Sequence, residues 1–160
     1  MKTYLIEGLS GTGKTTVCEE LKRRGYRTVD ADEELAFFAD PETLLPVEGK
    51  TTHWLWHKEK FHKAIQASED EPVFVCGGAT NQEEFKDHFN KIFTLHVDDE
   101  VLKHRILTST NYDYGKDPKE LEEQLEWNKR AVSYSKQRGT TLIDATKPIN
   151  EVANEILSLI

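Results

Sequence analysis

A glycine-rich segment near the N-terminus has the residue types and the spacing that hold phosphate groups. Residues 8–15 read Gly-Leu-Ser-Gly-Thr-Gly-Lys-Thr, a match to the pattern G-x-x-x-x-G-K-[ST]. Glycines let successive backbone N–H groups turn toward one phosphate. Lys14 can reach the β- and γ-phosphates, and the Thr15 hydroxyl can ligate Mg²⁺. The segment therefore predicts a site for ATP with Mg²⁺. The residues expected to hold the nucleotide here are Gly8, Ser10, Gly11, Thr12, Gly13, Lys14, Thr15 and Thr16.

An Asp-Ala-Asp segment follows a strand expected over 27–30. Parallel sheets bind ligands at the carboxyl ends of their strands, so Asp30 and Asp32 are expected near the bound phosphates. A carboxylate within reach of a hydroxyl group can orient it and take its proton during phosphoryl transfer. The alternative is that Asp30, Asp32, Glu33 and Glu34 only form the acidic first turn of a helix.

Strands and helices alternate along the chain, and this order must bring the two segments together. The pattern predicts one α/β domain spanning 1–160, a three-layer sandwich with a parallel sheet covered on both faces. Strands are expected over 4–7, 27–30, 72–76, 92–97 and 141–143. Helices are expected over 14–24, 33–38, 51–68, 82–88, 98–106, 119–137 and 150–159, with loops between 31 and 50 and over 111–118.

Composition limits the class of protein. The formal net charge of −8 argues against a nucleic-acid partner, which requires a concentrated basic face. No apolar run approaches the roughly 20 residues that span a bilayer, so no membrane partner is expected. Cys18 and Cys76 match no metal-binding spacing and are expected to be reduced thiols in a cytoplasmic protein.

The third expected strand separates the kinds of nucleotide-binding protein. It ends as Phe-Val-Cys-Gly-Gly over 74–78, without the carboxylates that a mechanical ATPase places there. An Asn-Lys-x-Asp segment for a guanine base is also absent from the sequence. A small domain with two loop-rich insertions favours a kinase whose lids close over two substrates.

The sequence resembles the P-loop small-molecule kinases, the adenylate, shikimate and gluconate kinase group. The resemblance covers essentially the whole chain, although only the phosphate loop is a specific motif. It implies a five-stranded parallel sheet in the order 2-3-1-4-5, an acceptor-binding insertion at about 31–68 and an ATP lid at about 108–118.

The same resemblance assigns roles to individual residues. The Asp-x-Asp segment of shikimate-type kinases implies one carboxylate near Mg²⁺, Asp30 beside Thr15, and one on the acceptor, Asp32; the two roles can be exchanged. The turn at Gly77 and Gly78 is similar to one that lets an acceptor approach the backbone, although a tight turn before a helix also needs glycine. The loop after the last strand implies adenine contacts from Ala145, Thr146 and Pro148.

The charge of the acceptor region favours a neutral acceptor. Nucleoside monophosphate kinases usually grip the acceptor phosphate with arginines, and the chain has none between Arg27 and Arg105. A hydroxyl-bearing acceptor such as a sugar, polyol or nucleoside is therefore expected. Trp54 shares helical spacing with Phe61 and Ile65 and is assigned to the core, which leaves Trp56 as the aromatic residue for the acceptor pocket.

Phosphoryl transfer also needs positive charge over the γ-phosphate. Besides Lys14, the expected catalytic cations are Arg105, on the helix entering the lid, and Arg130, on the helix leaving it. Related kinases often carry another arginine one turn after the first, where this chain has Ser109. The leading hypothesis is thus an ATP-dependent kinase of a small hydroxylated metabolite, either a monomer or a homodimer. The alternatives are a nucleoside monophosphate kinase and an ATP-binding regulatory protein without kinase activity.

Overall fold

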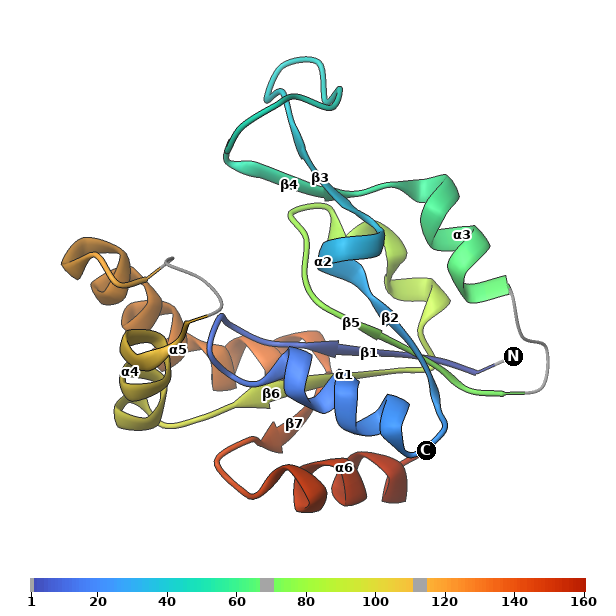
Figure 1. The fold of residues 1–160 in the computed structure, drawn as a ribbon, viewed down its shortest axis with the longest axis vertical. Helices are drawn as coiled ribbons and strands as arrows, with labels where there is room; N and C mark the ends of the chain where they lie inside the picture. The colour runs from blue at the N-terminus through green and yellow to red at the C-terminus, as the bar shows by residue number, and fades with distance from the viewer. Residues whose placement is uncertain (1, 67–70, 111–114) are drawn as a thin grey trace.

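The computed structural model describes residues 2–66, 71–110 and 115–160, and its main body is a sheet between two layers of helices (Figure 1). The strands of the main sheet are β1 (Thr3–Glu7), β2 (Arg27–Asp30), β5 (Val73–Cys76), β6 (Lys91–His96) and β7 (Thr141–Asp144). The helices are α1 (Lys14–Arg23), α2 (Ala31–Glu34), α3 (Lys58–Gln66), α4 (Asp99–Thr108), α5 (Pro118–Arg138) and α6 (Ile149–Ser158), with a 3₁₀ helix, η1, at Gln82–His88. Two further strands, β3 (Ala36–Ala39) and β4 (His53–Trp56), lie outside the sheet.

The main sheet has the order β2-β5-β1-β6-β7, and the strands pair in parallel. Counted among these strands alone, the order is 2-3-1-4-5. All residues of β1 and β5 are buried, as central parallel strands covered on both faces must be. The predicted fold class is therefore confirmed.

Alternation along β1 divides the core between the two faces of the sheet. Tyr4 and Ile6 pack with apolar residues of α1, α4 and α6. Leu5 points to the opposite face, where it packs with residues of α3 and η1, including Phe61 and Phe85. Both helical layers thus bury their apolar faces against one sheet.

The region between β2 and α3 differs from the prediction, because it forms an antiparallel hairpin, β3–β4, and not the helices expected over 33–38 and from residue 51. Phe38 faces Trp54 across the hairpin, with ring centroids 4.5 Å apart, the kind of aromatic cross-strand pair that stabilises antiparallel strands. Thr51 caps no helix, since its hydroxyl donates to the carbonyl of Ala39 at 2.7 Å. Helix α3 begins only at Lys58.

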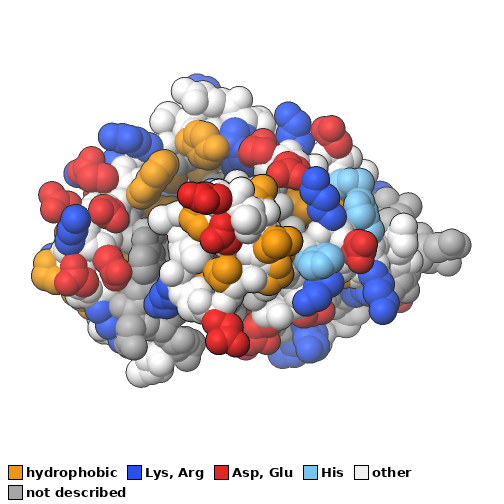
Figure 2. All heavy atoms as spheres, turned by 90° about the horizontal axis from the view of Figure 1, so that it is seen from above, with side chains coloured by type: hydrophobic (Ala, Val, Ile, Leu, Met, Phe, Trp, Pro, Cys, Tyr) orange, Lys and Arg blue, Asp and Glu red, His pale blue; other side chains and the backbone are white. Residues whose placement is uncertain are grey.

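The hairpin projects from the body of the molecule as an arm (Figure 1). Its tip exposes Leu44, Leu45 and Val47, and Figure 2, which views this end, shows hydrophobic side chains beside acidic ones.

The expected lid at 108–118 falls partly on 111–114, outside the described residues. Within the part that is described, no helix combines the length and apolarity needed to cross a membrane.

Candidate active site

The phosphate loop connects β1 to α1 at the carboxyl edge of the sheet. Gly8, Gly11 and Gly13 have positive φ angles of 155°, 83° and 100°, which L-residues with side chains rarely adopt. A Cβ on Gly8 would lie 2.6 Å from the Thr12 hydroxyl oxygen and 2.9 Å from the Leu95 carbonyl oxygen. Only glycine fits at this position, so the loop has the backbone path that its sequence pattern predicts.

Lys14 spans the loop from the first residue of α1. Its Nζ donates to the carbonyl oxygens of Gly8 at 2.7 Å and Leu9 at 3.1 Å. Burial lowers the pKa of Lys14, and the carboxylates of Asp32 and Glu7 oppose that shift. The ammonium group is thus held at the loop by carbonyl oxygens, where a triphosphate would supply the opposite charge.

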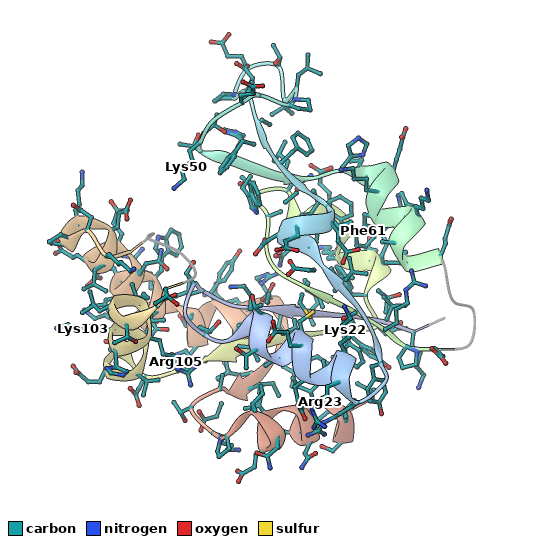
Figure 3. All side chains as sticks on the ribbon, in the orientation of Figure 1. Lys22, Arg23, Lys50, Phe61, Lys103 and Arg105 are labelled. Carbon is teal, nitrogen blue, oxygen red and sulfur yellow. The ribbon has the colours of Figure 1, made fainter. Side chains whose placement is uncertain are left out.

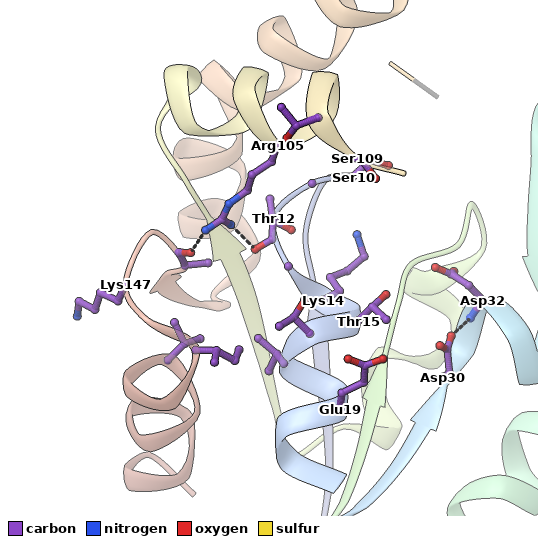
Figure 4. Close-up of a pocket in the computed structure, with 18 of the residues that line it drawn as sticks. Ser10, Thr12, Lys14, Thr15, Glu19, Asp30, Asp32, Arg105, Ser109 and Lys147 are labelled. Atoms are coloured by element: carbon purple, nitrogen blue, oxygen red, sulfur yellow. Dashed lines mark hydrogen bonds between the residues drawn. The ribbon is translucent and has the colours of Figure 1, made fainter. Parts of the chain in front are cut away.

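A cleft of about 820 Å³ opens beside the loop. Figure 4 shows Lys14 and Thr15 on one side of it and Asp30 and Asp32 on the other, with Arg105 above the loop. The structure therefore brings the phosphate loop, the two aspartates and Arg105 to one cavity, as the sequence predicts. The cleft is lined by Ser10, Gly11, Thr12, Gly13, Lys14, Thr15, Thr16, Val17, Glu19, Asp30, Asp32, Glu33, Arg105, Thr108, Ser109, Ala145, Lys147, Ile149 and Val152.

The loop expected to contact adenine is only partly in the cleft. Ala145 lines it, together with Lys147, but Thr146 and Pro148 do not. Thr146 donates its backbone N–H and its hydroxyl to Asp144, and Pro148 is the N-cap residue of α6. Both residues therefore lie outside the lining of the cleft, and their nucleotide contacts stay a prediction. Thr12, although it lines the cleft, donates its hydroxyl to the Leu9 carbonyl at 2.7 Å.

Asp30 and Asp32 fit both hypotheses for the acidic segment, the first turn of a helix and a pair of carboxylates at the site. Asp30 caps α2, because its Oδ1 accepts the backbone N–H of Asp32 at 3.1 Å and of Glu33 at 3.3 Å. Asp32 lies in the first turn of that helix and faces the cleft (Figure 4). The acidic turn therefore exists, and it also places two carboxylates opposite the phosphate loop.

The assignment of Trp56 to the acceptor pocket and of Trp54 to the core was wrong. Trp56 is 1% exposed and stacks on Phe61, with an interplanar angle of 9°, so it belongs to the core and not to a pocket. Trp54 is only partly buried, and its Nε1 donates to Asp32 Oδ1 at 3.3 Å. The error follows from the assumption of a helix, because both residues lie on strand β4, where positions two apart share a face and helical spacing from Phe61 does not apply.

The turn after β5 packs against the acidic helix. Gly77 has φ 145°, and a Cβ there would lie 2.9 Å from the Ala31 Cβ and 3.2 Å from Asp32 Oδ1. The close approach that requires glycine is thus between this turn and α2. Gly78 does not line the nucleotide cleft and lines a second cavity.

Replacing Gly77 with alanine is expected to lower the free energy of unfolding by about 1–3 kcal/mol, because the new methyl group meets α2 in a strained backbone conformation. Urea unfolding measures this loss. Gly25→Ala is the matched control, since its φ is also positive, at 91°, but a Cβ there meets nothing within 4 Å. Equal losses in the two variants would show that packing against α2 is not what requires glycine.

The two arginines proposed for catalysis occupy different places. Arg105 Nη1 donates to the Thr12 carbonyl at 3.3 Å, and Nη2 donates to the Ala145 carbonyl at 2.9 Å (Figure 4). Arg105 thus joins the phosphate loop to the loop after β7. Arg130 is exposed on α5 and lines a separate cavity, so the structure does not bring it to the nucleotide cleft. Ser109, at the position where the resemblance implies a second arginine, lines the cleft.

The oxygen donors of the cleft fit a nucleotide-bound Mg²⁺ and not a cage built by the protein. Within the described ranges, no group of three or more His, Cys, Asp or Glu residues is arranged to hold a metal ion. Mg²⁺ usually keeps several waters and takes one or two protein oxygens together with substrate phosphates. The exposed Thr15 hydroxyl and the Asp30 carboxylate face the same cleft and match that requirement.

Several solved structures share this fold. The shikimate kinase from Acinetobacter baumannii in complex with shikimate has a TM-score of 0.63 at 19% identity, covering 99% of this chain and 91% of that chain. The deoxyadenosine kinase from M. mycoides with bound dATP has a TM-score of 0.62 at 15% identity, covering 98% of each chain. A gluconokinase from Sinorhizobium meliloti 1021 has a TM-score of 0.55 at 20% identity, covering 98% and 90%. No curated protein matches the chain.

The phosphate loop, the sheet order and these similarities define a P-loop protein with the fold of the small-molecule kinases, as the sequence predicts. The family model of the AAA domain matches residues 5–126, more than half of the chain, and the protein belongs to that family.

Proposed function

We propose that the protein is an ATP-dependent phosphotransferase that moves the γ-phosphoryl group of ATP to a small hydroxyl-bearing metabolite. The observation that carries the proposal is the placement of Asp32 across one cleft from Lys14 and Thr15. This arrangement gives the transferred phosphoryl group a binding loop on one side and a carboxylate for the attacking hydroxyl on the other.

Each residue then has a defined task. The loop amides and Lys14 hold the β- and γ-phosphates in line for transfer. Asp32, oriented by the indole N–H of Trp54, positions the acceptor hydroxyl and takes its proton. Mg²⁺ on the phosphates would neutralise developing charge, and Thr15 and Asp30 are the residues that would hold it. Arg105 fixes the loop after β7 against the phosphate loop and thereby shapes the nucleotide end of the cleft.

A screen of ADP release in the presence of ATP and Mg²⁺ tests the proposal across acceptor classes. We expect neutral sugars, polyols or nucleosides to stimulate ADP release more than any nucleoside monophosphate, because the cleft wall opposite the loop carries Asp30, Asp32 and Glu33. Turnover of one monophosphate, without any response to neutral compounds, would support the nucleoside monophosphate kinase.

A second candidate function is an ATP-binding regulatory protein. It is favoured by Ser109 in the cleft and by the engagement of Arg105 with the carbonyl oxygens of Thr12 and Ala145. Tight ATP binding without ADP release on any acceptor class would support this function and would contradict the phosphotransferase.

A further inference from the structure

Cys18 and Cys76 are the two cysteines of the sequence, and the fold brings them together in the core. Cys18 lies on α1, and Cys76 is the last residue of β5. Both are free thiols, 7% and 4% exposed, and they share a hydrogen bond. Neither residue lines the nucleotide cleft, and the proposed transfer of phosphate uses neither thiol.

Cys18 is close to the lysine that holds phosphate. It follows Lys14 by four residues, so the two side chains lie on one face of α1. Lys14 is also near enough to Cys76 for the charges of the two groups to interact. The thiol pair therefore lies next to the phosphate loop, on the side of α1 that packs against the sheet.

Cys76 lies next to the opposite wall of the cleft. In the parallel sheet it pairs with Asp30 at the end of β2. The next residue, Gly77, begins the turn that packs against α2, where a Cβ would lie 3.2 Å from Asp32 Oδ1. A covalent bond between the two sulfur atoms would therefore join the helix that carries Lys14 to the strand end beside the two aspartates.

The two thiols differ in how readily they lose a proton. Hydrogen bonds with Cys76 and with Thr28 lower the pKa of Cys18, although burial opposes them. The hydrogen bond with Cys18, together with burial, raises the pKa of Cys76 well above its ordinary value. The thiolate is the nucleophile in thiol oxidation, so Cys18 is expected to react first, with Cys76 in contact as the resolving thiol.

We infer that Cys18 and Cys76 form a site of reversible oxidation, at which a hydroperoxide converts the two thiols to a disulfide and thereby weakens ATP binding. The inference goes beyond the proposed function, and it requires only that the phosphate loop binds ATP.

The oxidation has two steps. The Cys18 sulfur attacks one oxygen of hydrogen peroxide, the O–O bond breaks, and a sulfenic acid forms as one water leaves. The Cys76 sulfur then attacks the Cys18 sulfur, and the S–S bond forms as the S–O bond breaks and a second water leaves. The two thiols lose two electrons and two protons in total, which reduce the peroxide to two molecules of water.

The disulfide changes the position of the phosphate-binding helix. Its sulfur atoms lie about 2.05 Å apart, closer than two hydrogen-bonded thiols. We expect α1 to move toward β5, and Lys14 and Thr15 to move with it. A displacement on the order of 1 Å in groups that hold a substrate is enough for a large loss of function, so oxidation should weaken ATP binding.

Mass spectrometry and calorimetry on the full chain test the inference. After treatment with hydrogen peroxide, the intact mass should fall by two hydrogen atoms, and a peptide that contains Cys18 should be joined to one that contains Cys76. ATP affinity, measured with Mg²⁺, should fall at least about tenfold and should return to the value of the reduced protein after dithiothreitol is added.

Cys18→Ser is the matched control, because its hydroxyl can still hydrogen bond with Cys76 but cannot form a disulfide. Cys76→Ala removes the other thiol and replaces this control if serine at position 18 prevents folding. Each reduced variant should bind ATP like the reduced parent, since neither position lines the cleft, and peroxide should leave that affinity unchanged.

ATP must also oppose formation of the disulfide. Coupling between two binding or chemical equilibria is reciprocal, so saturating ATP should favour the dithiol by the same factor by which oxidation weakens ATP binding. Incubation in mixtures of reduced and oxidised dithiothreitol, with and without ATP, measures that factor.

The inference is overturned if peroxide leaves both thiols free, if the disulfide joins two chains, or if the disulfide forms while ATP affinity keeps its reduced value. An equal loss of affinity in peroxide-treated Cys18→Ser would also overturn it, because another residue would then be responsible. These results leave the proposed function in place, whereas failure of the reduced parent to bind ATP would overturn both.

Discussion

Lys14→Ala is expected to weaken ATP binding about 10- to 100-fold, because hydrogen bonds to charged groups contribute about 1.5–3 kcal/mol each. Among the residues that the structure describes, the ammonium group bonds the Gly8 and Leu9 carbonyls of its own loop, so its loss should have little effect on folding without nucleotide. Calorimetry with ATP and Mg²⁺ measures the affinity, and thermal unfolding of the nucleotide-free protein measures the stability.

Lys22→Ala is the matched control for this experiment. Lys22 is exposed on the same helix, does not line the cleft, and lies away from Arg105 in Figure 3. Its loss should change neither quantity. An affinity of the Lys14 variant equal to that of the parent would contradict the assignment of the phosphate loop.

Asp32→Asn should lower the rate of phosphoryl transfer by about 10²- to 10⁴-fold while ATP affinity stays near the parental value. The amide keeps the shape of the side chain and can still accept the Trp54 indole N–H, but it cannot take the acceptor proton. Single-turnover rates with an identified acceptor separate this loss from substrate binding.

Glu33→Gln removes the same charge from the next residue of α2, which also lines the cleft, and should leave the transfer rate nearly unchanged. Asp30→Asn can keep its capping bonds to the amides of Asp32 and Glu33 and should raise the Mg²⁺ concentration needed for activity. If the Asp32 and Asp30 variants both turned over like the parent, the acidic segment would be only the first turn of a helix.

The sheet and its phosphate loop could be predicted because their signals are local. Apolar runs such as 73–76 lie in strands buried on both faces, and residues 8–15 require a turn that almost only glycine permits. The arm could not be predicted in this way, since β3 and β4 pair with each other and are separated in the sequence by a loop. Phe61 and Ile65 do lie on one face of a helix, and extending that spacing back to Trp54 crossed the end of a strand.

The candidate site likewise has residues that local sequence signals predict and contacts that only the folded chain forms. Asp30 and Asp32 follow a strand whose end can be read from the sequence, so their place in the cleft was predictable. The contact between Trp54 and Asp32 depends on the hairpin, and the Glu7–Arg138 pair joins residues 131 positions apart. No local pattern carries contacts of that kind. The residue before the phosphate loop, Glu7, was the one available signal, because a carboxylate is unusual at the end of a buried strand.

The central claim is that this cleft transfers phosphate from ATP to a hydroxyl group. The most direct measurement follows both products in one reaction, with ADP quantified by chromatography and the acceptor analysed by mass spectrometry. We predict an acceptor that gains one phosphoryl group in an amount equal to the ADP formed, with both products lost together in Asp32→Asn. ADP formed without a phosphorylated acceptor, or in equal amount by the Asp32 variant, would contradict it.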